Sequence, residues 1–457
     1  MKKLLFFTIL SMNIAFAGAQ QSDSAVIKSF YNSALSSDTA YNNLEYLCTK
    51  IGGRLCGSPQ AAAAVEWSKQ LLKIMKLDTV YTQSVMVHHW VRGEKETASV
   101  ASKVHGSMDV HICALGESIG TPADGLTAEI VEVNSLEQLK KLGKKQITGK
   151  IVFFNKVMNP TFVNTFEAYG DAYWTRGHGA VEAARYGAVG VVIRSLTLSN
   201  DYSVHTGIMR YDTAVTKIPA VAISTKDADM LSEWLKDDYE LLFHFKTSCK
   251  MYPETESFNV IGEIKGSVHP DEIITIGGHL DAWELGQGAQ DDGVGCMHTI
   301  EVMRLFKELK IVPQHTIRLV LFMDEECAQR GARKYAAVVK EKKEKQIAAI
   351  ESDEGGFVPT GFTMDASADT VAMINKWKNL FLPYNIFNFS KGYSGVDVGF
   401  LRGQGIPLFG LETDSQRYFI SHHGDTDTFD RVNKRELQLG CATIASLVYL
   451  IDKDGIK

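Results

Sequence analysis

Acidic residues and histidines stand at the ends of several apolar runs in this chain. In the clearest case, the run 273–277 leads into His279 and Asp281, with Asp291 and Asp292 a short loop later. Apolar runs with β-branched residues are typical of buried parallel strands. Ligands and metals bind at the carboxyl ends of strands in open α/β sheets. Because histidine nitrogen and carboxylate oxygen both bind zinc, the motif predicts part of a metal site.

Later segments of the same kind are expected to supply the other ligands. The apolar run 316–323 leads into Asp324-Glu325-Glu326, and the run 346–350 leads into Glu351-Ser352-Asp353. A polar loop, His422-His423-Gly424-Asp425-Thr426-Asp427-Thr428, precedes the last helical segment. Side chains that directly follow the strands of one sheet converge on the same edge, so we expect these residues to meet at one site.

A doubly wound sheet is the framework that these segments require. From about 257 onward, strand-like runs alternate with helical patterns of a dozen or more residues, which is typical of such a sheet. Between about 110 and 250, short strand-like runs alternate with turns and a short helical segment. The predicted fold class is therefore α/β, a doubly wound mixed sheet with an inserted, smaller β-rich α/β domain.

The composition is that of an ordinary globular protein. The chain has 457 residues, of which 45% are hydrophobic and 22% charged, values typical of soluble proteins. This length predicts two domains, or one large domain with an insertion. The net charge of -6 gives no indication of nucleic-acid binding.

The N-terminus has the features of a secretory signal. Lys2 and Lys3 precede the apolar run 4–14, and small residues follow at Ala17 and Ala19, which predicts a signal peptide over residues 1–19. The alternative is an N-terminal anchor, but the run is too short to span a bilayer comfortably. We therefore expect an exported protein, periplasmic or secreted, without a membrane span.

Seven cysteines are scattered through the chain without CxxC spacing, so they do not predict a zinc cluster. Disulfides form in exported proteins, and Cys48 and Cys56 are the nearest pair. Free, buried cysteines are an equally good interpretation of the pattern. The odd count leaves at least one cysteine unpaired within the chain.

Four motifs, taken in order, resemble the di-zinc exopeptidase family that includes bacterial aminopeptidases and carboxypeptidase Q. They are GGHLDAWELGQGAQDDGVG, DEECAQRGA, ESDEGG and HHGDTDT, and the likeness is closest to the carboxypeptidase Q branch. The segment RGHGAVEAARYGAVGVVIRS is similar to a protease-associated domain. The resemblance implies a phosphorylase/hydrolase-like catalytic domain over 22–108 and 254–457, and a protease-associated-like inserted domain over 109–253.

The same resemblance implies a set of ligands for two zinc ions per chain. His279 and Asp353 would bind one ion, Glu326 and His423 the other, and Asp291 would bridge both. Three carboxylates and a bridging hydroxide would balance two divalent ions. Cobalt or manganese would also suit these ligands.

Histidine 422 and histidine 423 are ambiguous from the residues alone. The spacing His-x-x-x-Asp-Thr favours His423 with Asp427, which leaves His422 in a structural role. The alternative register, His422 with Asp425, lacks this spacing.

Three further residues are candidate catalytic residues. The resemblance assigns Glu325 to proton transfer, because a general base must take a proton from a metal-bound water, whose pKa is lowered to roughly 7. Asp281 is expected either to orient the imidazole of His279 or to cap the following turn. Tyr393 is expected either to stabilise the oxyanion or to contribute only packing. Val396-Asp397-Val398 stands where many family members have Ser-Asp-His, so the local substrate contacts differ.

The expected function is hydrolysis of dipeptides or short peptides with a free N-terminus. The resemblance to the carboxypeptidase Q branch favours dipeptidase or carboxypeptidase activity, and aminopeptidase activity, which uses the same chemistry, is the close alternative. A receptor-like binding protein and a one-zinc, glutaminyl-cyclase-like acyltransferase are the alternatives from other classes. The five filled ligand positions argue against the first, and the inserted domain against the second. The resemblance also suggests a homodimer.

Overall fold

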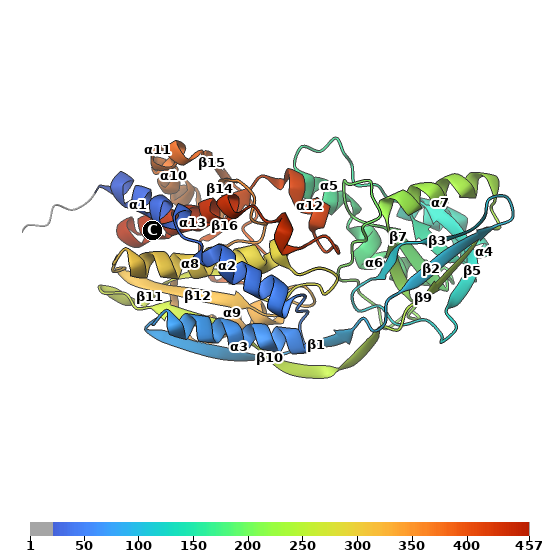
Figure 1. Ribbon diagram of the computed structural model, residues 1–457, viewed down its shortest axis with the longest axis horizontal. Helices are drawn as coiled ribbons and strands as arrows, with labels where there is room; N and C mark the ends of the chain where they lie inside the picture. Colours follow the sequence, from blue (N-terminus) through green and yellow to red (C-terminus); the bar gives the residue numbers. More distant parts are fainter. Residues whose placement is uncertain (1–21, 457) are drawn as a thin grey trace, which may run out of the picture.

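The computed structural model describes residues 22–456 and contains two eight-stranded mixed sheets (Figure 1). The predicted signal peptide, residues 1–19, lies outside the described residues. The first sheet has the strand order β1-β10-β12-β11-β13-β16-β14-β15. Its strands are β1 (Thr79–Val91), β10 (Lys250–Ile264), β11 (His269–His279), β12 (His315–Phe322), β13 (Lys345–Glu351), β14 (Pro359–Asp365), β15 (Asn388–Lys391) and β16 (Leu408–Thr413).

The centre of the first sheet is parallel and buried on both faces. Strand β11 runs parallel to β12 and β13, and β13 runs parallel to β16. Alternate residues of β12 enter different cores: Ile317, Leu319 and Leu321 face one, whereas Val320 and Phe322 face the other. Since side chains alternate across a strand, helices must cover both faces. The prediction of a doubly wound mixed sheet is confirmed.

Two groups of helices supply this cover. Helices α1, α8 and α13 pack together on one face, and α9 packs on the other. Residues Val294 to Phe306 form most of α8 and are buried almost all round the helix. The helices of this part are α1 (Asp23–Leu35), α2 (Thr39–Tyr46), α3 (Pro59–Ile74), α8 (Val294–Glu308), α9 (Arg330–Lys342), α10 (Ala368–Lys376), α11 (Lys378–Phe381), α12 (Tyr418–Ser421) and α13 (Lys434–Asp454).

The second sheet lies at the other end of the elongated molecule (Figure 1). Its order is β3-β2-β9-β5-β6-β7-β8-β4, with α6 contributing to the core on one face and α7 to the core on the other. The elements are β2 (Thr97–Ser102), β3 (Gly106–Val110), β4 (Ile112–Ala114), β5 (Leu126–Val133), α4 (Leu136–Ile147), β6 (Ile151–Phe154), α5 (Thr165–Ala172), α6 (Trp174–Arg185), β7 (Gly190–Arg194), β8 (Ala220–Ile223), α7 (Thr225–Asp237) and β9 (Leu242–Lys246).

The chain enters and leaves this second unit through two paired strands. Strands β1 and β10 run antiparallel, and Val91 lies opposite Lys250. This pairing brings the two ends of the insertion together, so the first sheet stays continuous. The second sheet begins at Thr97, ahead of the boundary predicted at 109. The division into two domains stays a prediction, and the strand pairing favours 97–246 for the inserted unit.

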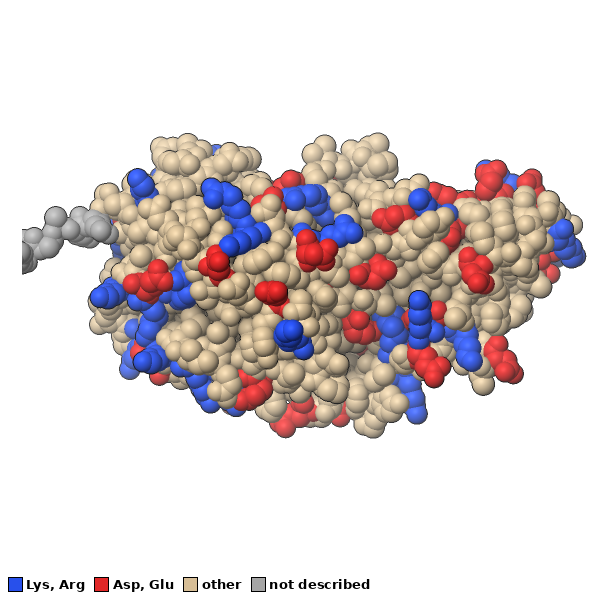
Figure 2. Space-filling view, in the orientation of Figure 1, with Lys and Arg blue, Asp and Glu red and all other residues tan. Residues whose placement is uncertain are grey.

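Three further features of residues 22–456 bear on the sequence predictions. Within this part of the chain, no helix combines the length and apolar character needed to cross a bilayer. On the face shown in Figure 2, acidic and basic side chains are interspersed. All seven cysteines are buried and free, including the nearest pair, Cys48 and Cys56.

Candidate metal centre

Three parallel strands deliver the predicted ligands to one edge of the first sheet. His279 ends β11 opposite Phe322 of β12, and Gly277 lies opposite Glu351 at the end of β13. Glu326 and Asp353 follow β12 and β13 within a few residues, so their side chains reach the same edge as His279. These side chains therefore converge at the carboxyl ends of the strands, as expected.

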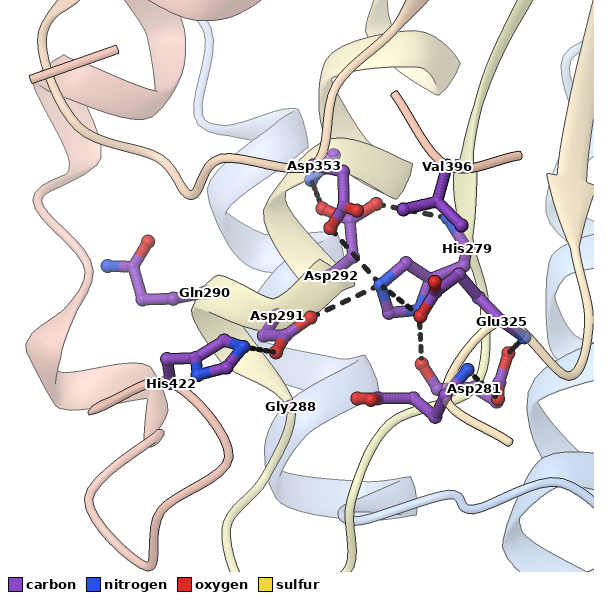
Figure 3. Close-up of polar contacts among 12 residues, drawn as sticks. His279, Asp281, Gly288, Gln290, Asp291, Asp292, Glu325, Asp353, Val396 and His422 are labelled. Carbon is purple, nitrogen blue, oxygen red and sulfur yellow. Dashed lines mark hydrogen bonds and ion pairs between the residues drawn. The ribbon is translucent and has the colours of Figure 1, made fainter. Parts of the chain in front are cut away.

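Asp291 lies between His279 and His422 in Figure 3, and it also contacts His423, so it stands between two groups of candidate ligands. His279 Nε2 lies 3.2 Å from Oδ1 of Asp291 and 3.2 Å from Oδ1 of Asp353. His423 Nε2 lies 3.3 Å from Oδ2 of Asp291 and 3.0 Å from Oε2 of Glu326. The two oxygens of Asp291 therefore face two different histidines, as a bridging carboxylate would.

The neighbouring His422 is less well placed. Its ring stacks on His423 with centroids 3.7 Å apart, and its Nε2 is 3.7 Å from Asp291. Its Nδ1 is buried without a hydrogen-bond partner. The shorter distances from His423 to two carboxylates favour His423 as the ligand.

The charges and orphaned atoms at this centre suit divalent metal ions. Burial raises the pKa of Glu325 and Glu326 well above the usual carboxyl range, and the carboxylate of Asp291 raises both further. Oδ2 of Asp291 and Oε1 of Glu326 are buried without a hydrogen-bond partner. Buried carboxylates in such number need cations, and a set of nitrogen and oxygen donors fits zinc.

Buried carboxylates hold the loops that carry the ligands. The carboxylate of Asp292 accepts hydrogen bonds from the amides of His279 and Gly295, both at 3.0 Å. The carboxylate of Asp427 accepts from the amides of Gln290, at 2.7 Å, and Asp291, at 3.2 Å. Asp292 thus ties the end of β11 to the start of α8.

Asp281, expected either to orient the imidazole of His279 or to cap the following turn, contacts this imidazole through its backbone. The backbone carbonyl of Asp281, and not its carboxylate, contacts Nδ1 of His279, at 2.9 Å. The carboxylate, which is fully buried, accepts from the amides of Glu325, at 3.1 Å, and Glu326, at 3.3 Å. Asp281 therefore positions the loop that carries the candidate base and a candidate ligand.

Glu325 and Tyr393 both line a cavity of about 350 Å³ beside the ligands. Oε2 of Glu325 is 4.0 Å from Nε2 of His279. Tyr393 is 60% exposed. Tyr169, Tyr173 and Arg176, from α5, α6 and the residue between them, also line the cavity. The inserted unit thus forms part of the wall.

Sequence reasoning did not identify two of the supporting residues. The buried guanidinium of Arg54 donates to the carbonyls of Leu280, Gln287 and Gly288, which fixes the loop between His279 and Asp291. A lone arginine gives no local signal of this role. The carboxylate of Glu351 accepts from three successive amides, 396–398. Its position at the end of a strand is the one signal in the sequence that points to this role.

Comparisons with known proteins define the class. Residues 259–448 match the model of peptidase family M28. Carboxypeptidase Q from Mus musculus is 34% identical over 412 residues, which cover 90% of this chain and 85% of that protein. This chain therefore belongs to peptidase family M28. The prediction of a metallopeptidase of the exopeptidase class is confirmed.

Solved structures agree with this assignment. The peptidase M28 precursor from Shewanella amazonensis SB2B has a TM-score of 0.90 and 34% identity, covering 94% of this chain and 96% of that one. A zinc aminopeptidase from Bacillus subtilis has a TM-score of 0.64 and 20% identity, covering 92% and 96%. The second likeness shows the shared fold alone.

Proposed function

We propose that this protein is an exported di-zinc exopeptidase that hydrolyses dipeptides or short peptides. The observation that carries the proposal is the position of Asp291, whose two oxygens face His279 and His423 separately. A single carboxylate shared between two ligand pairs supports two ions rather than one. His279 and Asp353 would hold one zinc, Glu326 and His423 the other, and Asp291 would bridge them.

When bound, the two zinc ions would polarise the peptide carbonyl and lower the pKa of a bound water to about 7. Glu325 lines the cavity beside His279, where its carboxylate can take a proton from the attacking water and deliver it to the leaving amine. The amides of the 325–326 loop are held by Asp281, which keeps the base in place. Tyr393, whose side chain also lines the cavity, would donate a hydrogen bond to the developing oxyanion.

The competing activities differ in the end of the peptide that is recognised. Carboxypeptidase Q, as named, supports dipeptidase or carboxypeptidase activity for this chain, at 34% identity over most of its length. A probable aminopeptidase of Saccharomyces cerevisiae, 28% identical over 206 residues, keeps aminopeptidase activity as the alternative. A non-catalytic binding protein would have no need for a complete ligand set beside Glu325.

The decisive experiment measures release of free amino acids from a panel of dipeptides by the zinc-loaded protein. Chelation is expected to abolish release, and Glu325→Gln to lower kcat by about 10²- to 10⁴-fold with zinc content unchanged. Glu354→Gln makes the same charge change in the same cavity and is expected to alter kcat by less than about tenfold. An unchanged rate in Glu325→Gln would refute the assigned base, and a metal content well below two would refute the di-zinc centre.

Export and dimerisation need tests of their own. The N-terminal sequence supports export, so mass spectrometry of protein recovered outside the cytoplasm is expected to show a chain lacking about the first 19 residues. A homodimer is expected from the family, and light scattering of the purified protein would give twice the monomer mass.

A further inference from the structure

Two buried cysteines lie close together beside the metal centre. Cys56 precedes α3, Cys327 directly follows Glu326, and both side chains are 1% exposed. Their sulfurs and a carboxylate oxygen of Asp324 all lie within 4.8 Å of one another. Among the groups of potential metal ligands in residues 22–456, this is the one that contains cysteine. Both are free thiols in this structure, and two thiols so close can either share a metal ion or form a disulfide.

The surroundings of the pair suit a metal ion poorly. The cluster offers three donors, whereas structural zinc sites hold the ion with four protein ligands. Oδ2 of Asp324 already accepts a hydrogen bond from the amide of Arg330, at 3.3 Å. Sγ of Cys56 contacts the carbonyl of His88 at 3.4 Å. The imidazole of His88 is engaged at both nitrogens, by Glu117 and Arg330, so it is not free to complete such a site. A disulfide needs only the two sulfurs.

Both cysteines lie on backbone that other contacts hold in place. The chain beside Cys56 passes so close to β1 that a Cβ atom on Gly57, which has a φ of +79°, would lie 2.6 Å from a backbone carbonyl of that strand. Cys327 lies in a turn in which the carbonyl of Asp324 accepts from the amides of residues 328 and 329, at 3.2 and 2.6 Å. The fold therefore keeps the two sulfurs near each other, and rotation of the side chains can bring them to the disulfide distance of about 2.05 Å.

We propose that Cys56 and Cys327 form a disulfide bond, an inference that rests on the export stated in the proposed function, since disulfides form and persist outside the cytoplasm. The thiolate of one cysteine attacks a small disulfide oxidant of the glutathione type and releases one thiol from it. The thiolate of the other cysteine then displaces the second thiol. Two electrons and two protons thus pass from the pair to the oxidant, which becomes two thiols. Because both side chains are buried in the folded protein, the exchange takes place while the chain folds.

The bond joins two segments that hold the metal centre in shape. Two residues before Cys56, the guanidinium of Arg54 fixes the loop 280–288. Cys327 continues the loop 325–326, which carries the candidate base and a candidate ligand. A link between residues so far apart in the sequence also removes conformational freedom from the unfolded chain. The disulfide therefore stabilises the fold and holds the loop 325–326 against the N-terminal part of the chain.

The test counts free thiols in protein recovered outside the cytoplasm without reductant. The protein is unfolded, alkylated and analysed by mass spectrometry. Of the seven cysteines, five are expected to be alkylated, and a cross-linked peptide is expected to join residues 56 and 327. Treatment with a phosphine reductant before alkylation is expected to release all seven thiols.

Cys48→Ser is the matched control for Cys56→Ser. Cys48 is also 1% exposed and lies in the same N-terminal part of the chain, but it is outside the cluster with Cys327. In Cys48→Ser the disulfide is expected to remain, so four of the six remaining cysteines are alkylated without reductant. In Cys56→Ser all six are expected to be alkylated.

The stabilising role is tested with the double variant Cys56→Ser/Cys327→Ser. Its unfolding temperature is expected to be about 5–10 °C below that of the oxidised wild type. A phosphine reductant present during heating is expected to lower the wild-type value by a similar amount and to leave the double variant unchanged. Hydrogen exchange at the amides of residues 325–326 is expected to be several-fold faster in the double variant, and equal exchange would refute the holding of this loop.

Seven free thiols in wild-type protein that has lost its first 19 residues would overturn the proposal. A third zinc ion in the wild type, absent from Cys56→Ser, would also overturn it and assign the pair to a metal. If the variants do not fold, the wild-type thiol count decides. Failure of export looks different, because the same mass spectra would show a chain that keeps its N-terminal residues.

Discussion

The buried carboxylate of Asp281 gives the sharpest test of how the catalytic loop is held. It accepts the amides of Glu325 and Glu326. In Asp281→Asn the side chain keeps one oxygen acceptor but presents an NH2 group to the other amide. One charge-assisted hydrogen bond is lost, which costs about 1.5–3 kcal/mol. Since about 1.4 kcal/mol is a factor of ten, local opening of the loop is expected to be about 10- to 150-fold more frequent.

Hydrogen–deuterium exchange at pH 7 measures this opening directly. Mass spectrometry of peptides that contain residues 325–326 is expected to show faster exchange at these amides by that factor. Asp427→Asn is the matched control, because its carboxylate holds the amides of Gln290 and Asp291 in the same way. The Asp427→Asn change is expected to speed amide exchange at residues 290–291 and to leave exchange at residues 325–326 unchanged.

The opposite assignment of Asp281 predicts a different result. If its carboxylate acted through the imidazole of His279, Asp281→Asn would weaken zinc binding and leave exchange at 325–326 at the wild-type rate. Unchanged protection of both amides would therefore refute the role inferred from the structure.

Three further predictions concern the metal centre, the cavity and the core. His423→Gln is expected to lower bound zinc from two ions to about one, whereas His422→Gln keeps both; equal losses by mass spectrometry would contradict the assignment. Tyr393→Phe is expected to lower kcat by about 10²-fold at constant KM. Unchanged steady-state kinetics would show that Tyr393 contributes packing and not oxyanion stabilisation. Burial lowers the pKa of His298 to about 4, so the neutral ring is favoured in the folded protein, and the free energy of unfolding is expected to fall by about 3 kcal/mol as the pH drops from 6.5 towards 4. In urea unfolding, the stability of His298→Gln is expected to depend less on pH than that of the wild type. Parallel plots of stability against pH for the two proteins would contradict this.

The predicted ligands meet in the structure because each belongs to a local pattern. His279 ends one strand, and Glu326 and Asp353 follow two others closely. A parallel sheet brings such ends together whatever the length of the chain between them. The alternation of strands and helices after 257 predicted the sheet for the same reason, because periodicity is a local property of the sequence.

Residues that act across long sequence distances gave no such signal. Arg54 precedes the first sheet strand, yet its guanidinium holds the loop at 280–288. The role of Asp281 depends on where two amides of another loop lie, which periodicity does not encode. The sequence predicts a start of the inserted unit at 109, because the alternation of short strand-like runs with turns begins near there. Strands β2 and β3 pair with β9 further along the chain, and only that pairing shows where they belong.

The inserted unit and the metal centre depend on each other. Segment 205–206 pairs with the loop that carries His423, so a candidate ligand of the catalytic part is held in place by the insertion. The carbonyl of Thr206 in the same segment accepts a hydrogen bond from Arg176, which lines the cavity. Loosening the insertion is therefore expected to weaken metal binding. An insertion that served only to narrow access would instead leave zinc affinity unchanged when its contacts with the His423 loop are weakened.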